Sequence, residues 1–471
     1  MDKRIILLFT ALLAISCVSA KVKLPSVFTD HMVLQQQTVT KIWGKADGGR
    51  MVELVGSWDN KTYTVKSDEK GYFEFEVTTP AAGGPYTIQI SDGEPLILND
   101  VLIGEVWFCS GQSNMEMPVK GYRGQPVYGS HPYIVSADEK RPLRLFTVGN
   151  AWSKEAKDDV EGHWSLSSPK EVSDFSAVAY FFGNLLQEKL QVPVGLINCS
   201  WSASKIEAWM SRETLDTIPE VDLSVLKNTE FGYPNGTPTL LHNAMVQPLH
   251  GICVKGILWY QGEANSNAPA LYKKLFPAFV QQWRNFFHSP GMPFYYVQIA
   301  PWQSGNKDEL DWALFRECQL ELMSEVPNTG MVITADAGSE KFIHPPYKIK
   351  VGERLAYWAL AKTYGIDGFA YSGPVYQSYT LKDNMAELTF DYAADGLNPE
   401  KELLDGFEIA GKDGVFVEAK AEVIEGSGKV RVWSELVSNP VEIRYCFRNY
   451  KIGNLTNNAG LPASPFRVKI K

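Results

Sequence analysis

The middle of the chain, residues 101–365, alternates apolar runs with longer segments of helical periodicity, and this pattern most limits the possible folds. The apolar runs that predict strands are residues 103–109, 143–148, 194–199, 254–260, 294–299 and 331–335. Residues 176–189 and 271–288 predict helices, with Pro277 expected to kink the second. Continuous apolar strands joined by helices are typical of a parallel sheet covered on both faces, so we expect an α/β domain here.

Both ends of the chain differ from the middle, because they contain short predicted strands separated by turn residues. Near the start, Phe73, Phe75 and Val77 alternate with glutamates, the period of two expected for a strand with one wet face. After Gly365 short strands return, for example at residues 386–390 and 430–433. We predict an N-terminal β-sandwich over residues 21–100 and a C-terminal β module over residues 366–471.

Residues 1–20 have the pattern of a secretory signal peptide. A charged start precedes the apolar residues 5–15, and the small residues Val18, Ser19 and Ala20 follow. We expect cleavage after Ala20 and a secreted or periplasmic protein. Lipid attachment at Cys17 is the alternative, because residues 14–17 weakly resemble a bacterial lipobox. No later segment is long and uncharged enough to predict a membrane span.

The composition indicates which classes of binding partner are expected. A formal net charge of −9 without a basic run argues against nucleic acid. The 13 Trp, 21 Tyr and 23 Phe residues include faces that suit sugar rings, although most of them are expected in the core. Of the 6 cysteines, 5 lie outside the predicted signal and show no C-x-x-C spacing, so neither a structural zinc site nor a dense disulfide framework is expected. Nothing in the sequence indicates the oligomeric state.

Ser113 directly follows the first strand of the predicted sheet. The strand ends at a Ser-Gly pair, and a tight turn from a strand into a helix presents one side chain and unpaired backbone N–H groups. Ser113 is therefore a candidate nucleophile. The alternative is a serine that caps a helix after an ordinary glycine turn. Sites in open α/β sheets form at the carboxyl ends of the strands, and Ser113 lies at such an end.

A serine nucleophile needs a base, and His344 is the best placed of the 7 histidines. It follows the apolar run 331–335 and precedes a predicted helix whose apolar stripe includes Val351, Leu355 and Trp358. A simple turn residue before Pro345 is the alternative reading.

Two further polar loops follow predicted strands. Residues 259–265 bring Gln261, Glu263 and Asn265, and residues 200–204 follow the run 194–199. An acyl-transfer site needs donors for an oxyanion and a group that orients an imidazole. Polar, catalysis-capable groups after four strands of one sheet favour a single active site over unrelated turns.

These motifs resemble the sialate O-acetylesterases of the SGNH hydrolase group. The resemblance rests on Gly-Gln-Ser-Asn-Met (111–115), Trp-Tyr-Gln-Gly-Glu (259–263) and Ile-His-Pro (343–345), and it extends to residues 175–180, 206–209, 243–245, 316–317, 351–356 and 460–467. It implies an SGNH-type three-layer α/β/α domain with a parallel sheet. It also implies a secreted carbohydrate O-deacetylase that uses serine and histidine on an acetylated sugar or glycan, with no metal or other cofactor.

The resemblance also suggests site residues. Ser113 is expected to be the nucleophile and His344 the base. The oxyanion would be bound by the N–H of Ser113, by an N–H from the Ser202-Ala203 turn, and by the side chain of Gln261 or Asn265. Relatives often carry Gly-Gly at that turn, so strain in a left-handed conformation is expected here.

The acid behind His344 departs from the family pattern. Many relatives have an aspartate shortly before the histidine, whereas this chain has Glu-Lys-Phe-Ile at residues 340–343. We therefore predict that Glu263 orients His344, with Glu340 and Asp336 as the alternatives.

The sugar is not encoded in a recognisable motif. Trp209 and Trp302 are candidate stacking platforms, although a tryptophan in such a place is more often a core or rim residue. Arg316 or Lys205 is a candidate partner for a sialate carboxylate. Two alternatives to a sialate O-acetylesterase stay open: an esterase for acetylated xylan or other plant glycans, and a non-catalytic glycan-binding protein on a hydrolase fold.

Overall fold

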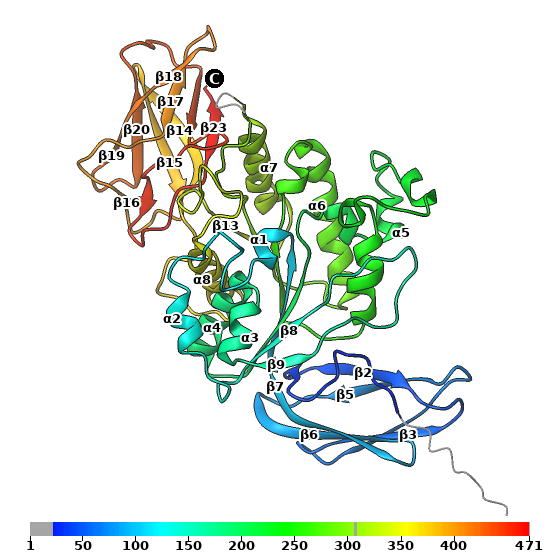
Figure 1. The fold of residues 1–471 in the computed structure, drawn as a ribbon. Coiled ribbons are helices and arrows are strands. Elements are labelled where there is room, and N and C mark those ends of the chain that lie inside the picture. The colour runs from blue at the N-terminus through cyan, green and yellow to red at the C-terminus, as the bar shows by residue number, and fades with distance from the viewer. Residues whose placement is uncertain (1–21, 306–308, 471) are drawn as a thin grey trace, which may run out of the picture.

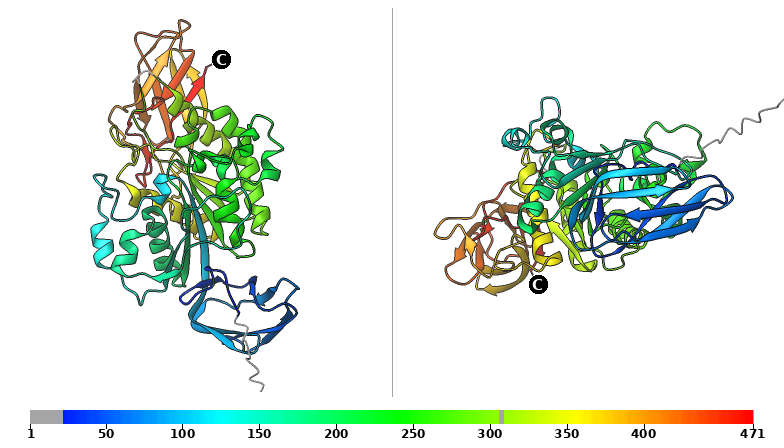
Figure 2. Two further views of the ribbon diagram at one scale, coloured as in Figure 1. Left: turned by 45° about the vertical axis from the view of Figure 1, so that its right-hand side comes forward. Right: turned by 90° about the horizontal axis from the view of Figure 1, so that it is seen from below.

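Three groups of strands follow one another along the molecule in the computed structural model, which describes residues 22–305 and 309–470 (Figure 1). A β module at the start of the chain and another at its end lie at opposite ends of a mixed α/β region (Figure 2). The predicted signal peptide and Cys17 lie outside the described residues.

The central sheet has the strand order β13-β12-β11-β7-β10-β8-β9. Its strands are β7 (Pro95–Gly111), β8 (Leu143–Thr147), β9 (Trp164–Leu166), β10 (Val194–Ser200), β11 (Gly256–Tyr260), β12 (Phe294–Val297) and β13 (Thr329–Val332). Neighbours pair in parallel, except that β9 runs antiparallel to β8. All six predicted runs form strands here, so the prediction of an α/β domain is confirmed. Strand β9 is not among the predicted runs.

Successive side chains of β7 pack on opposite faces of the sheet. Trp107 and Cys109 belong to a buried cluster with α4 (Ala177–Leu190) and α8 (Lys348–Trp358). Val106 and Phe108 pack in a second cluster with α6 (Pro269–Phe286) and α7 (Asp311–Glu325). Figure 1 shows the two helix pairs on either side of the sheet. Both faces of the second half of β7 are therefore closed to water, which explains the unbroken apolar run at residues 106–109.

The N-terminal module contains β1 (Val33–Gln35), β2 (Val39–Lys45), β3 (Met51–Gly56), β4 (Thr62–Lys66), β5 (Tyr72–Thr78) and β6 (Gly83–Ser91). Phe73, Phe75 and Val77 are all buried in β5, which confirms the predicted alternation. Strand β6 pairs with the first half of β7, and the second half of β7 belongs to the central sheet. One strand thus crosses the domain boundary predicted at residue 100. The predicted domain limits stay a prediction.

The C-terminal module has two four-stranded antiparallel sheets that share one core. The first is β14 (Val375–Lys382), β15 (Met385–Asp391), β20 (Lys429–Trp433) and β19 (Lys420–Ile424). The second is β18 (Phe416–Glu418), β17 (Phe407–Ala410), β21 (Glu442–Tyr445) and β23 (Phe466–Lys469). Strands β16 (Leu397–Asn398) and β22 (Thr456–Asn457) form a separate pair.

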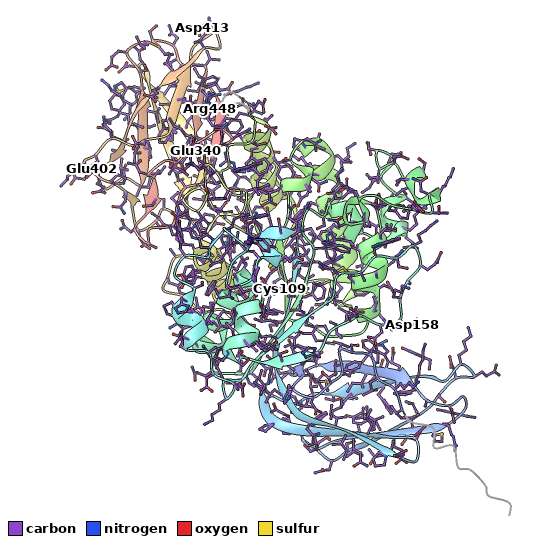
Figure 3. The ribbon with its side chains drawn as sticks, in the orientation of Figure 1. Cys109, Asp158, Glu340, Glu402, Asp413 and Arg448 are labelled. Atoms are coloured by element: carbon purple, nitrogen blue, oxygen red, sulfur yellow. The ribbon has the colours of Figure 1, made fainter. Side chains whose placement is uncertain are left out.

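The remaining helices are short: α1 (Ser113–Glu116), α2 (His131–Val135), α3 (Pro169–Asp174) and α5 (Arg212–Leu215). Among the described residues, no helix is long and apolar enough to cross a membrane. Cys109 lies fully buried at the centre of the sheet, where burial raises the pKa of its thiol (Figure 3).

Candidate active site

The end of β7 forms a turn that only glycine fits. Gly111 has a φ of +144°, and a Cβ added to it would lie 2.1 Å from the carbonyl oxygen of Tyr260. The N–H of Gln112 then donates to that same carbonyl, at 3.0 Å. Ser113 follows as the first residue of α1. The close approach of β7 to the end of β11 therefore fixes the turn that presents Ser113.

The side chain of Gln112 joins this turn to the next loop. Its Oε1 accepts the N–H groups of Gly262, at 3.3 Å, and Ala264, at 3.2 Å. Gly262 has a φ of +155°, and an added Cβ would lie 2.5 Å from the ring of Phe315. The loops after β7 and β11 are thus held as one unit.

The backbone around Ser113 leaves one donor free. Its carbonyl accepts from the N–H of Met117, at 2.8 Å, and from the hydroxyl of Tyr122, at 3.2 Å. Its own N–H donates to no other group in the described part of the chain. A free N–H beside a serine hydroxyl is what a developing oxyanion requires.

Asn114 connects three loops through one amide. Its Nδ2 donates to Oε1 of Glu263, at 2.5 Å, and to the carbonyl of Ile343, at 3.1 Å. Its Oδ1 accepts from Nζ of Lys348. Ile343 precedes His344 in the chain, so this amide brings the predicted nucleophile and the predicted base into one site.

Glu263 and Lys348 are two buried ionisable groups that Asn114 bridges through hydrogen bonds. Glu263 is 8% exposed and Lys348 is 0% exposed. Burial raises the pKa of Glu263, against the hydrogen bond from Asn114 and the charge of Lys348. Burial also lowers the pKa of Lys348 to about 7, against the charge of Glu263. Sequence reasoning missed Lys348, because a lysine at the start of a helix is typical of a solvated surface.

His344 is held by a separate loop. Its Nδ1 lies 2.9 Å from Oε1 of Gln125, and its ring meets the ring of Tyr122 edge-on at a centroid distance of 5.2 Å. An amide oxygen can only accept, so the proton of the neutral imidazole is on Nδ1 and Nε2 keeps its lone pair. Burial and then the charge of Lys348 lower the pKa of His344 to about 4.

Comparison with known proteins places this site within a family. The model of the family described as "Carbohydrate esterase, sialic acid-specific acetylesterase" matches residues 103–361, more than half of the chain. The chain belongs to this family. The matched segment contains Ser113, Glu263 and His344.

Individual relatives agree with the family model. The esterase is 27% identical to mouse sialate O-acetylesterase over 428 residues, which cover 78% of each chain. It is 29% identical to the human enzyme over 406 residues, which cover 78% of this chain and 76% of that protein. The crystal structure of a carbohydrate acetylesterase from Xanthomonas citri matches with a TM-score of 0.86 and 33% identity, over 96% of this chain and 100% of that one. The protein is thus an ester hydrolase, as predicted, and the non-catalytic alternative has no support.

The hydrogen bond predicted between Glu263 and His344 is replaced in the esterase by other contacts. Glu263 bonds Asn114 instead, and its Oε2 has no hydrogen-bond partner among the described residues. The imidazole is bonded by Gln125, which the sequence did not single out. Gln125 lies 219 residues from His344, in a loop without a periodic pattern.

The two alternative acids are also engaged elsewhere. Asp336 pairs with Arg354 and Lys350. Burial acts to raise the pKa of Asp336, but these two cations lower it overall. Glu340 is exposed, and its charge acts on Tyr450 of the C-terminal module (Figure 3).

The Ser202-Ala203 turn keeps one of its two candidate oxyanion donors. The N–H of Ser202 donates to Oε2 of Glu116, at 2.7 Å, and its hydroxyl bonds the same oxygen, so Ser202 is corrected as a donor. Ala203 has a φ of +56°, the left-handed conformation expected where relatives often carry glycine. Its N–H has no partner among the described residues.

The two predicted amide donors, Gln261 and Asn265, differ in whether a side-chain N–H group remains free. Gln261 uses Nε2 on the carbonyl of Ser204, at 3.0 Å, and on Oδ1 of Asn265, at 2.7 Å. Both of its N–H groups are therefore engaged, and Gln261 is corrected as an oxyanion donor. Asn265 donates from Nδ2 to Glu207, at 2.9 Å, which leaves it one N–H.

Two of the predicted substrate-binding residues belong to the core. Arg316 is fully buried and donates to the carbonyls of Cys446 and Arg448, so it cannot reach a sugar carboxylate. Trp209 is also fully buried, and its indole donates to Oγ of Ser204, at 2.9 Å. Trp302 is half-buried and packs edge-on against Trp312. Trp302 and Lys205 are both partly exposed and keep accessible surface.

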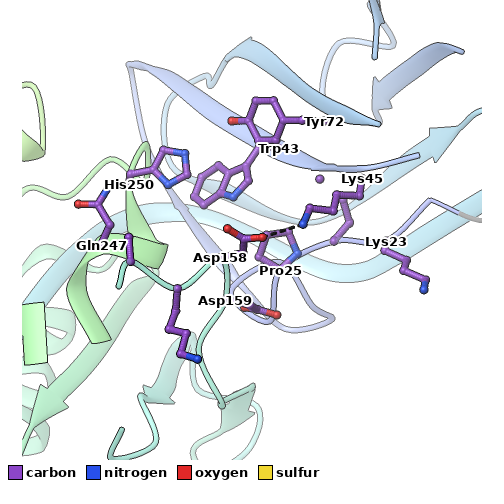
Figure 4. Close-up of a pocket in the computed structure, with 13 residues that line it drawn as sticks. Lys23, Pro25, Trp43, Lys45, Tyr72, Asp158, Asp159, Gln247 and His250 are labelled. Carbon is purple, nitrogen blue, oxygen red and sulfur yellow. Dashed lines mark hydrogen bonds and ion pairs between the residues drawn. The ribbon is translucent and has the colours of Figure 1, made fainter. Parts of the chain in front are cut away.

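A pocket of about 350 Å³ lies away from these residues, between the N-terminal module and residues 156–159 (Figure 4). Trp43 and Tyr72 line it, together with Asp158 and His250. Asp158 is paired there with Lys45 at 2.7 Å. No residue of the site described above lines this pocket.

Proposed function

We propose that this protein is a secreted carbohydrate O-acetylesterase that works through a Ser113 acetyl-enzyme with His344 as the base. The observation that carries the proposal is the 3.1 Å hydrogen bond from Asn114 to the carbonyl of Ile343. Ser113 directly precedes Asn114 in the chain, and His344 directly follows Ile343. Membership of an acetylesterase family supplies the reaction class.

The proposed reaction has two halves. Oγ of Ser113 attacks the acetyl carbonyl while Nε2 of His344 takes the serine proton. His344 then gives this proton to the departing sugar oxygen, which leaves acetyl-Ser113 and the free sugar hydroxyl. Water attacks the acetyl group with the same base, and acetate and free Ser113 result. The bond from Nδ1 of His344 to Gln125 supports this role, since it leaves Nε2 free to accept a proton.

We assign the oxyanion to the backbone N–H groups of Ser113 and Ala203, with the remaining N–H of Asn265 as a third donor. Both backbone groups lack other partners among the described residues. A single oxyanion donor typically contributes about 10²- to 10³-fold in kcat.

The finer description of the fold and the cellular location belong to the same proposal. Two buried clusters on opposite faces of β7 support the SGNH-type three-layer arrangement. Residues 1–20 support secretion or a periplasmic location. Sequencing the N-terminus of the exported protein tests this: Lys21 at the N-terminus fits cleavage after Ala20, whereas a lipid-modified Cys17 supports the alternative.

Two substrate classes compete. The named relatives are sialate O-acetylesterases, and a sialate carries a carboxylate. Glu116 favours a neutral glycan ester instead, because its carboxylate lies three residues after Ser113 and is held by Ser202 and by Asn150, at 3.0 Å. A fixed negative charge near the bound sugar would repel a sialate by about 1–2 kcal/mol, or roughly tenfold in rate.

Acetate release from acetylated sialic acids and from acetylated xylo-oligosaccharides tests both the reaction and the substrate. Release from sialic acids supports a sialate O-acetylesterase, and release from xylo-oligosaccharides alone supports the neutral-glycan alternative. Glu116→Gln should improve turnover of sialates relative to xylo-oligosaccharides by about tenfold. Glu340→Gln serves as the charge-matched control. No release from either class would contradict the proposed function.

A further inference from the structure

One turn of the chain presents two side chains to His344. Residues 121–125 close on themselves, since the N–H of Gln125 donates to the carbonyl of Tyr122, at 2.9 Å. Gly121 has a φ of +81°, and an added Cβ would lie 2.4 Å from the carbonyl oxygen of Gln125. The tight turn therefore fixes the positions of Tyr122 and Gln125 relative to each other.

The two side chains restrain the imidazole in different directions. Oε1 of Gln125 meets Nδ1 of His344 at 2.9 Å, and a hydrogen bond of this kind lies in the plane of the ring. The ring of Tyr122 packs edge-on, at an interplanar angle of 67°. The hydroxyl of Tyr122 also donates to the carbonyl of Ser113, at 3.2 Å. The turn thus connects the base directly to the backbone of the nucleophile.

We propose that Gln125 is a positioning residue for His344, the neutral counterpart of the acid in a catalytic triad. This rests on the proposed Ser113 and His344 mechanism. Gln125 selects the tautomer in which Nε2 accepts the serine proton, and it fixes the ring while the proton moves.

The neutrality of Gln125 has its own consequence. A carboxylate in the same place would stabilise the imidazolium by charge, which an amide oxygen does only weakly. The other titratable groups around His344 are Tyr122 from the same turn and Lys348 from α8, with Glu263 beside Lys348. The charge of Lys348 lowers the pKa of His344 and so destabilises the imidazolium. A carboxylate at position 125, in contact with the ring, would oppose this effect.

The test compares Gln125→Met and Gln125→Glu with Arg123→Ala, a control at an exposed position in the same loop. The rates kcat and kcat/KM for p-nitrophenyl acetate are measured as a function of pH. Gln125→Met keeps the length of the side chain without the acceptor, and we expect kcat to fall by about 10- to 100-fold at nearly unchanged KM. Gln125→Glu should restore kcat and move the acidic limb of the profile up by about 1–2 pH units. Arg123→Ala should match the parent enzyme.

Different outcomes overturn different statements. If Gln125→Met folds and keeps kcat within about twofold, while Ser113→Ala and His344→Ala are inactive, the positioning role is wrong and the proposed mechanism stands. If Ser113→Ala keeps near-normal activity, the proposed mechanism itself fails. Should Gln125→Met not fold, Gln125→Glu decides, because an unmoved acidic limb in that variant contradicts the contact with His344.

Discussion

Asn114 lies between two charged side chains that are closed to solvent, whereas Gln125 meets His344 at the half-exposed side of the same site. The first region holds three loops together with one amide, a carboxylate and an ammonium group. The second holds a titratable ring with a neutral amide and an aromatic edge. The buried carboxyl and amine groups thus lie beneath the loops, and neither forms a hydrogen bond to the imidazole among the described residues.

Stability and reactivity therefore depend on different groups in this site. A buried network of an amide, a carboxyl and an amine is costly to break, so its loss should lower stability first. A neutral hydrogen bond to the base should affect rate and pH dependence with little effect on stability. Variants in the two regions should therefore separate stability from rate.

Ser113→Ala should reduce acetate release by about 10⁴-fold or more, because it removes the attacking atom itself. The free energy of unfolding should stay close to that of the parent, since the hydroxyl forms no hydrogen bond among the described residues. Hydrolysis of p-nitrophenyl acetate and urea unfolding measure the two quantities. Near-normal turnover would remove Ser113 from the mechanism.

Glu263→Gln should lower the free energy of unfolding by about 1–3 kcal/mol, because the buried amine of Lys348 loses the carboxylate that favours its charged form. Urea unfolding measures the loss. Activity should fall as the loops around Asn114 loosen. The double variant with Lys348→Met should recover part of the stability, since no buried charge is left unpaired.

The matched control for that experiment is Glu340→Gln, at an exposed carboxylate, with an expected change of about 0.5 kcal/mol or less. The same pair of variants also shows which of the two carboxylates, Glu263 or Glu340, affects catalysis. If Glu340→Gln alone loses activity by orders of magnitude, Glu263 has no part in catalysis.

The pH profile of kcat/KM should show an acidic limb near pH 4 in place of the ordinary value of 6.5. Burial and the charge of Lys348 lower the pKa of His344 to about 4. The ring therefore stays neutral, and able to accept a proton, as the pH falls from 7 to 5, and activity is lost as the pH falls through 4. A limb at 6.5 would mean that His344 is not the base or is more solvated than the structure indicates.

Ala203→Gly should have a small stabilising effect, a gain of about 0.5–1 kcal/mol in the free energy of unfolding. A left-handed conformation costs a residue with a Cβ about 1–2 kcal/mol, and the greater freedom of glycine in the unfolded chain offsets part of the relief. The backbone N–H is retained, so activity should change by less than about threefold. A loss of stability would show that Ala203 packs usefully through its methyl group.

Much of the fold follows from local sequence. The apolar runs of the central sheet are continuous because both faces are covered, and that alone locates the strands and the turn that carries Ser113. The strain at Ala203 was equally predictable, because a residue with a Cβ stands where the family often has glycine.

The site predictions that were wrong share one physical cause: the hydrogen-bonding groups of these residues are bonded to residues far away in the sequence. Arg316 is a candidate ligand for a carboxylate by sequence, but its guanidinium donates hydrogen bonds to backbone carbonyls 130 and 132 residues away. The partner of His344 was sought among acids, yet it is an amide from a loop 219 residues away. Composition and periodicity indicate that a polar side chain needs a hydrogen-bond partner, but they do not indicate which distant residue is that partner.

The 17 residues of β7 make a continuous strand about 55 Å long, paired with β6 at its beginning and with β10 and β11 at its end. The N-terminal module therefore cannot be removed without cutting a strand that it shares with the central sheet. Cutting the gene near codon 100 would sever the same backbone that aims Ser113, and grafting the module onto another enzyme would require splicing inside a hydrogen-bonded strand. For anyone recombining such esterases, the safe crossover points lie elsewhere in the chain.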